Sequence, residues 1–160
     1  MQKTFQTITC CFTGHRPEKL QKSESDICFA LQNEIALALN DGYTIFLTGM
    51  SRGVDLWAAE LVLKYRSLYP IKLFCAIPFY GFEESWSQYW QTQYRQVLSQ
   101  ADGHRFFSPS FSYASYHERN RWMVDHASLV IGVYHSGRGG TFQTLTYAKK
   151  QNRALRILEG

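Results

Sequence analysis

Apolar residues fall along the chain in two alternating kinds of segment. Short, continuously apolar runs are typical of strands buried on both faces, and they occupy residues 8–13, 43–48, 71–77, 129–134 and 154–158, with a shorter run near 105–107. Segments with apolar side chains three and four positions apart, the spacing of a helix, lie between them at residues 23–39, 53–65, 85–100, 115–126 and 141–151. The alternation predicts an α/β fold of three layers, in which helices cover both faces of a doubly wound, mostly parallel sheet.

Local signals mark the ends of two of these helices. Ser23 opens helix 23–39, and residues 40–42 end it with a glycine, which enters the left-handed conformation without a steric penalty. Ser115 and Glu118 match a capping box, in which each side chain bonds the other's backbone amide, so we expect a helix to start at Ser115.

Helix 85–100 carries an aromatic stripe made of Trp86, Tyr89, Trp90 and Tyr94. Aromatic residues at helical spacing more often form core or interface than a platform for nucleobases. We therefore expect this face to be buried, and it is also a candidate contact between copies of the chain in a homo-oligomer.

Length and composition limit the class of protein. The chain has 160 residues, of which 45% are hydrophobic and 19% charged. This size fits one domain, residues 1–160, and the apolar content excludes an intrinsically disordered chain. No apolar run approaches the roughly 20 residues that cross a bilayer, and the polar N-terminus is unlike a signal peptide, so we expect a cytoplasmic protein with no membrane partner.

The charge balance and the pattern of cysteines and histidines limit the kinds of ligand that the chain can be expected to bind. The chain has 17 basic against 13 acidic residues, a net charge of +4, which suits an anionic ligand without requiring nucleic acid. The four cysteines lack zinc-type spacing and are expected to be free thiols, and the five histidines form no metal pattern. We therefore expect neither a metal nor a cofactor.

Three glycine-containing loops follow predicted strands. In a parallel sheet such loops leave from the carboxyl edge, where ligands bind beside the topological switch point. The loops are Gly14-His15-Arg16-Pro17, Gly49-Met50-Ser51-Arg52-Gly53-Val54-Asp55 and Ser136-Gly137-Arg138-Gly139-Gly140-Thr141. Glycines let a backbone approach a phosphate closely, and the following helix start favours negative charge. Any one loop could be a simple turn with a solvated arginine, but three together on one edge predict an anion site.

We assign roles within this predicted site. Arg16, Arg52 and Arg138 are expected to contact phosphate, with the backbone amides of Gly14, Gly53, Gly139 and Gly140 around it. The segment Arg119-Asn120-Arg121 is expected to face the same cleft, and Asp55 or Asn120 to bond ribose hydroxyls. Phe79 or Tyr80 is the candidate contact for a nucleobase, and His15, then His117, are the histidines we place at the site.

Two familiar motifs are only partly matched. Residues 49–53 fit the G-x-S-x-G nucleophile elbow, but nothing in the sequence brings His126 or His135 to Ser51. Residues 132–138 resemble a Walker A loop, yet Arg138 and Gly139 replace its Lys and Ser/Thr, which argues against Mg-dependent nucleotide hydrolysis.

The ordered motifs resemble the YpsA-type family of the SLOG superfamily. They are residues 13–17, 48–55, 77–79, 119–125 and 139–141, and the resemblance runs from about Thr9 to Ile157. It implies a Rossmann-like fold, a bacterial source and a nucleotide or nucleotide-derived ligand at the glycine loops.

Two other SLOG groups suggest alternative functions. LOG enzymes hydrolyse the N-glycosidic bond of nucleoside monophosphates and carry a glutamate three residues after the threonine of their glycine-rich loop. Here that position is Thr144, and Asp55 is the carboxylate that would substitute. DprA-type proteins share the Arg-Asn-Arg helix and bind single-stranded DNA, for which +4 is a small net charge.

Three hypotheses follow, in order of preference. The first is a nucleotide-binding sensor or regulatory protein, and the second a slow, LOG-like hydrolase with Asp55 as its catalytic group. The third is a DprA-like binder of single-stranded nucleic acid.

Overall fold

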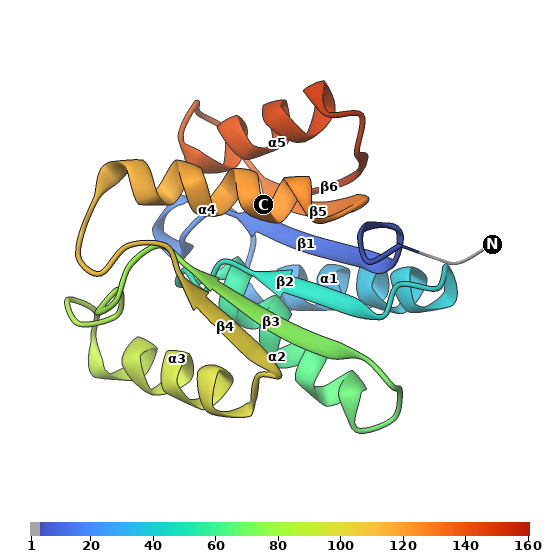
Figure 1. Ribbon diagram of the computed structural model, residues 1–160, viewed down its shortest axis with the longest axis horizontal. Helices are drawn as coiled ribbons and strands as arrows, with labels where there is room; N and C mark the ends of the chain where they lie inside the picture. Colours follow the sequence, from blue (N-terminus) through green and yellow to red (C-terminus); the bar gives the residue numbers. More distant parts are fainter. Residues whose placement is uncertain (1–3) are drawn as a thin grey trace.

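A computed structural model of the protein describes residues 4–160, which form a six-stranded parallel sheet between two layers of helices (Figure 1). The strands are β1 (Thr9–Gly14), β2 (Ile45–Thr48), β3 (Lys72–Ile77), β4 (Gly103–Phe106), β5 (Leu129–Tyr134) and β6 (Ala154–Glu159). The helices are α1 (Glu24–Asn40), α2 (Val54–Arg66), α3 (Gln88–Gln100), α4 (Tyr113–Asp125) and α5 (Gly140–Lys150), with short 3-10 helices η1 (Gln6–Ile8) and η2 (Pro17–Lys19). The predicted three-layer α/β fold is confirmed.

The sheet has one point at which the direction of winding reverses. Its strand order is β4-β3-β2-β1-β5-β6, with every neighbouring pair parallel. The chain therefore builds outward from β1 to β4 and then crosses to the other side of β1 for β5 and β6. The carboxyl ends of β1 and β5 diverge into loops on opposite faces there, which opens a crevice for a ligand.

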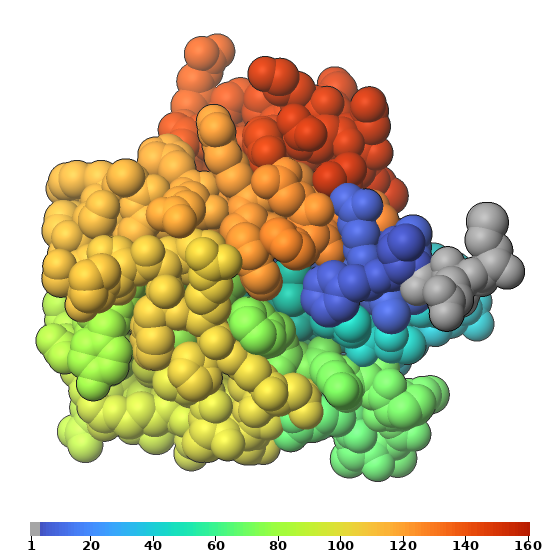
Figure 2. Space-filling view, viewed as in Figure 1, coloured from blue at the N-terminus to red at the C-terminus, as the bar shows by residue number. Residues whose placement is uncertain are grey.

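Alternate side chains of the strands supply two separate cores. One core joins Cys10, Phe12, Phe46 and Leu73 to α1, α2 and α3. The other joins Cys11, Leu47, Ala76 and Val130 to α4 and α5, which lie side by side on their face of the molecule (orange to red in Figure 2). Because both faces of each central strand are buried, the strands are continuously apolar, as the sequence indicated.

The ends of α1 agree with their sequence signals. The Ser23 hydroxyl accepts a hydrogen bond from the amide of Asp26 (3.1 Å) and so caps the helix. Gly42 has a φ of +94°, the left-handed conformation expected after this helix.

The capping box predicted at Ser115 is wrong. Helix α4 starts at Tyr113, and Ser115 lies inside its first turn, where its hydroxyl donates to the carbonyl of Ser112 (2.6 Å). Ser112 is the N-cap residue, so the Ser115 side chain is used for a bond back to the N-cap carbonyl and does not cap the helix itself.

The aromatic stripe predicted for helix 85–100 packs largely into the first core, although α3 itself begins at Gln88 and leaves Trp86 in the preceding turn. Tyr94 is buried, and Trp86 and Trp90 pack against that core, while Tyr89 is exposed. All four cysteines, which lie within the described chain, are free thiols. Within residues 4–160, no helix combines the length and apolar character needed to cross a membrane.

Candidate functional site

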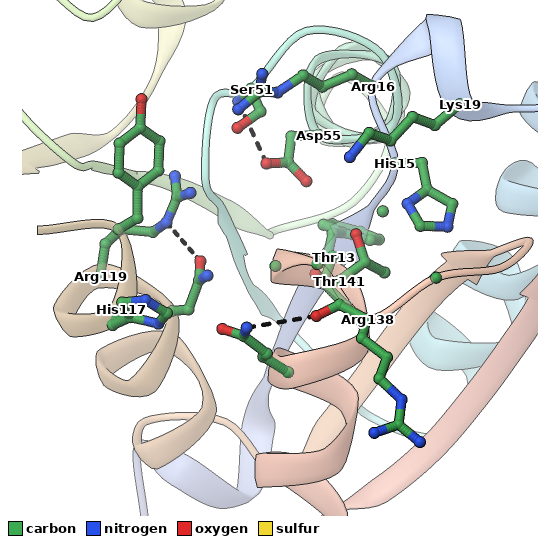
Figure 3. A pocket seen from close by; sticks show the side chains of 18 of the residues that line it. Thr13, His15, Arg16, Lys19, Ser51, Asp55, His117, Arg119, Arg138 and Thr141 are labelled. Atoms are coloured by element: carbon green, nitrogen blue, oxygen red, sulfur yellow. Dashed lines mark hydrogen bonds between the residues drawn. The ribbon is translucent and has the colours of Figure 1, made fainter. Parts of the chain in front are cut away.

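A cavity of about 600 Å³ opens at the carboxyl edge of the sheet, at the switch point between β1 and β5 (Figure 3). The loops after β1 and β5 form two of its walls, and the loop after β2 and the N-terminal half of α4 complete it. These segments are distant in sequence. The loops meet because the strands that precede them are parallel neighbours, and α4 joins them because it packs beside α5.

Most of the residues proposed from the sequence meet at this cavity. The lining includes Gly14, His15, Arg16, Ser51, Asp55, Arg119, Asn120, Arg138, Gly139, Gly140 and Thr141. Pro17, Gly49, Arg52, Gly53 and Phe79 lie outside the lining. Arg52 instead donates two hydrogen bonds to the Glu18 carboxylate (2.8 and 3.3 Å), which holds its guanidinium beside η2.

The glycines of the loops serve two different purposes. A Cβ on Gly14 would lie 2.5 Å from the Val54 side chain, and one on Gly53, whose φ is +87°, would lie 2.9 Å from Pro17. Packing of the first loop against α2 therefore requires both. A Cβ on Gly140 would have no neighbour within 4 Å, and one on Gly139 would meet only the Lys19 ammonium, at 3.8 Å. Neither has a positive φ, so no packing or backbone constraint explains glycine at the start of α5.

The start of α5 offers unpartnered backbone donors to the cavity. The amide of Gln143 bonds the Gly139 carbonyl, so the amides before it in the first turn lack an acceptor within the helix. With the helix dipole, these amides form a favourable place for an anion.

The Lys19 side chain brings positive charge beside this helix start. In Figure 3, Lys19 extends toward the centre of the cavity and Arg16 extends toward Ser51, whereas the Arg138 guanidinium points away from Asp55. Arg138 lies 5.8 Å from the ring of Phe142. The loop motifs of the sequence do not include Lys19, although it follows Gly14 closely; the short helix η2 turns it back over the cavity.

Asp55 is a buried carboxylate in the cavity lining, and one of its oxygens has no hydrogen-bond partner. It is 5% exposed, and its Oδ2 accepts a hydrogen bond from the Ser51 amide (3.2 Å), while Oδ1 has no partner. Burial raises the pKa of Asp55 to about 6, and the positive charge of Arg119 and the bond from Ser51 oppose that rise.

Arg119 connects α4 to the ends of two strands. Its Nη1 donates to the carbonyls of Gly49 and Ala76, and its Nε donates to the Asn120 Oδ1 (2.7 Å). A Cβ on Gly49 would lie 2.6 Å from this Nη1 and 2.8 Å from the Asp55 Oδ2. Gly49 therefore acts through packing, since it lets the buried arginine and carboxylate approach each other.

His15 is buried beside the cavity, and its burial favours the neutral form of the imidazole. It is 6% exposed, its ring lies 5.2 Å from the Tyr134 ring, and its Nε2 has no hydrogen-bond partner. Burial lowers the pKa of His15, and the charge of Lys19 lowers it further.

The aromatic contacts of the cavity differ from those expected. Phe79 is buried behind Phe111 and Tyr116, and Tyr80 lies by a separate shallow pocket beside Phe106. The aromatic residues that line the cavity are Phe12, Phe111, Tyr113 and Tyr116. Helical spacing back from Asn120 leads to Tyr116 and Tyr113, and this is the sequence signal that could have found them.

Neither the nucleophile elbow nor the LOG-type glycine loop has its catalytic partners in place. His126 bonds the Trp122 carbonyl and His135 lies 3.4 Å from Glu159, so neither reaches Ser51. The Thr144 hydroxyl donates to the Gly140 carbonyl within α5 (2.8 Å). Among the residues that the structure describes, no three His, Cys, Asp or Glu side chains are arranged to hold a metal ion.

Fold and site together define a Rossmann-like α/β protein with a cavity at its switch point. The family model YpsA, described as the YspA SLOG family, matches residues 10–157, and the chain belongs to that family. The UPF0398 protein of Bacillus pumilus is 28% identical over 141 residues, covering 81% of this chain and 74% of the relative. The UPF0398 protein YpsA of Bacillus subtilis is 28% identical over 138 residues, covering 81% and 77%.

Two solved structures have a similar fold. The X-ray structure of DNA processing protein A (DprA) from Streptococcus pneumoniae matches with a TM-score of 0.65 and 15% identity, over 98% of this chain and 52% of the DprA chain. The X-ray structure of TM1055 matches with a TM-score of 0.54 and 15% identity, over 92% and 71%. This chain thus spans about half the length of the DprA chain.

Proposed function

We propose that the protein binds a nucleotide or nucleotide-derived ligand in the switch-point cavity and acts as a sensor or regulatory protein. The observation that carries this proposal is the start of α5. Gly139 and Gly140 border open space there, no packing requires them, and the Lys19 ammonium lies beside them. A phosphate group accounts for all three features, since it needs close backbone approach, amide donors and a cation.

The rest of the cavity suits the rest of a nucleotide. The unpartnered oxygen of Asp55 can accept a hydrogen bond from a ribose hydroxyl. The rings of Phe111, Tyr113 and Tyr116 offer a surface for the base. His15, neutral and buried, adds a ring nitrogen that can bond the ligand without adding charge.

A second candidate function, a slow LOG-like hydrolysis of a nucleotide's glycosidic bond, rests on Asp55. A buried carboxylate with a free oxygen in the cavity could stabilise positive charge that develops on the sugar. The α5 position where LOG enzymes carry glutamate holds Thr144, whose hydroxyl bonds its own helix, and this favours binding over catalysis.

The first experiment is ligand-observed NMR of the protein with AMP, ADP-ribose, NAD and a short oligodeoxynucleotide, followed for hours. We expect line broadening of a nucleotide without new resonances. New sugar or base resonances that Asp55→Asn abolishes would establish the hydrolase instead. Broadening of the oligonucleotide alone would support a DprA-like role.

The phosphate assignment has its own test, Lys19→Ala. Loss of one charge-assisted hydrogen bond should weaken AMP binding about tenfold and leave adenosine binding unchanged, as measured by titration calorimetry. Lys72→Ala, at the opposite edge of the sheet, removes the same charge and serves as the control. Equal AMP affinity in the two variants would disprove the assignment.

A further inference from the structure

A second cavity continues from the main one along the surface between α4 and α5. This α4/α5 groove has a volume of about 380 Å³, and it is lined by His117, Asn120, Arg121, Phe142, Gln143, Thr144, Thr146, Tyr147 and Lys150. His117, Asn120 and Gln143 line both cavities, so the groove is an extension of the switch-point site.

The groove presents positive charge and hydrogen-bond donors. Arg121 and Lys150 are exposed along it, and none of the described residues in its lining is acidic. The Arg121 guanidinium lies 5.1 Å from the centre of the Tyr147 ring, and the Tyr147 hydroxyl is held by Asp125 (2.7 Å), whose carboxylate is outside the lining. Arg121 therefore packs on an aromatic ring that is itself held in place. Its side chain loses less conformational entropy on binding a ligand than a freely moving arginine would.

The junction of the two cavities also favours an anionic ligand. The side-chain oxygen Oδ1 of Asn120 already accepts a hydrogen bond from the Arg119 Nε (2.7 Å). The side-chain NH₂ group of Asn120 is therefore left to donate to a ligand. A ligand that leaves the start of α5 meets these donors and the His117 imidazole before it reaches Arg121.

The two cavities together extend along most of α5. Lys150 lies ten residues beyond Gly140 on the same helix, a distance of about 15 Å at the α-helical rise per residue. A phosphate held at the start of α5, with its own ribose, does not extend that far, whereas a second nucleotide unit does.

We infer that the α4/α5 groove binds the second, phosphate-bearing unit of a dinucleotide-type ligand whose first phosphate lies at the start of α5. This inference rests on the proposed function and narrows its ligand to a molecule with two phosphate groups separated by a nucleoside. A free dinucleotide and the end of a nucleic-acid strand share this chemistry, and the site as described is complete with two units.

The test compares AMP with the 5′-phosphorylated dinucleotide pApA by titration calorimetry. In the wild-type protein, pApA should bind about tenfold more tightly than AMP. The double variant Arg121→Ala/Lys150→Ala should lose this advantage and bind AMP unchanged. Arg95→Ala/Lys149→Ala, which removes equal charge from α3 and from the position beside Lys150, should retain it, because neither residue lines the groove.

Other results would overturn the inference. If AMP binds but pApA binds no more tightly, or if the groove variant keeps the advantage, the groove has no such role while the proposed function stands. If neither ligand binds, the inference fails, and the proposed function fails too unless ADP-ribose or NAD binds. A twelve-nucleotide single strand should bind about as tightly as pApA; much tighter binding that both double variants weaken equally would show general attraction to charge, not a two-unit site.

Discussion

At the scale of single residues, the most unusual group is Asp55. Its carboxylate is buried near the buried guanidinium of Arg119, and both groups lie against Gly49. Burial disfavours the charged form more than Arg119 favours it, so the pKa of Asp55 rises to about 6.

This shift predicts a pH dependence of folding that Asp55→Asn removes. A carboxyl group with a higher pKa in the folded than in the unfolded state stabilises the fold fully below the unfolded pKa, near 4, and loses that contribution as the pH rises through about 6. Relative to Asp55→Asn, the wild-type free energy of unfolding should fall by about 2 kcal/mol from pH 4 to pH 7. Chemical denaturation at both pH values measures this.

Groups other than Asp55 titrate in both wild type and Asp55→Asn, so their contributions cancel in the difference between the two free energies of unfolding. Asp102 is a suitable comparison, since its bonds to Leu73 and Arg66 lower its pKa, and Asp102→Asn should therefore shift in the opposite direction. A constant difference between wild type and Asp55→Asn over this pH range would contradict the assigned pKa.

At the scale of elements, the glycines at the start of α5 and at the end of β2 meet different requirements. Glycine at the start of α5 has open space around it, whereas Gly49, at the end of β2, has no room for a side chain. The same type of residue thus reflects ligand access in one place and internal packing in the other.

Gly140→Ala and Gly49→Ala should therefore have opposite effects on stability. Alanine at position 140 fits the helical backbone and should raise the free energy of unfolding by about 0.5–1 kcal/mol, while its methyl group weakens AMP binding. Alanine at position 49 should lower it by about 1–3 kcal/mol, because its Cβ meets Arg119 and Asp55. Denaturation with and without AMP measures both; full AMP affinity in Gly140→Ala would remove α5 from the site.

Most elements were predictable within three residues of their observed ends. Helix α1 was clearest, because a polar cap and a terminal glycine bound an amphipathic segment. Helix α4 starts earlier than predicted, since a capping-box pattern does not fix which serine becomes the N-cap: Ser112 takes that position, and Ser115 bonds its carbonyl.

At the scale of the molecule, the cavity joins the two halves of the sheet, which meet at β1 and β5. A ligand held by loops from both halves binds the folded chain and not the unfolded one. AMP at a hundredfold excess over its dissociation constant should raise the wild-type free energy of unfolding by about 2.7 kcal/mol. Lys19→Ala at the same concentration should gain distinctly less, as followed by thermal unfolding; an equal gain would place AMP elsewhere on the protein.

By itself, the sequence determined the fold class, the placement of three loops on one sheet edge and the family resemblance. These follow from hydrophobic periodicity and from short motifs, which are local properties of the chain. It also indicated most of the residues that line the cavity.

Only the tertiary structure decided which of those residues meet. It turned Arg52 toward Glu18, placed Phe79 behind Phe111, and brought in Lys19 and the α4/α5 groove. The physical reason is that a side chain's direction and burial depend on neighbours distant in sequence, which no local pattern specifies.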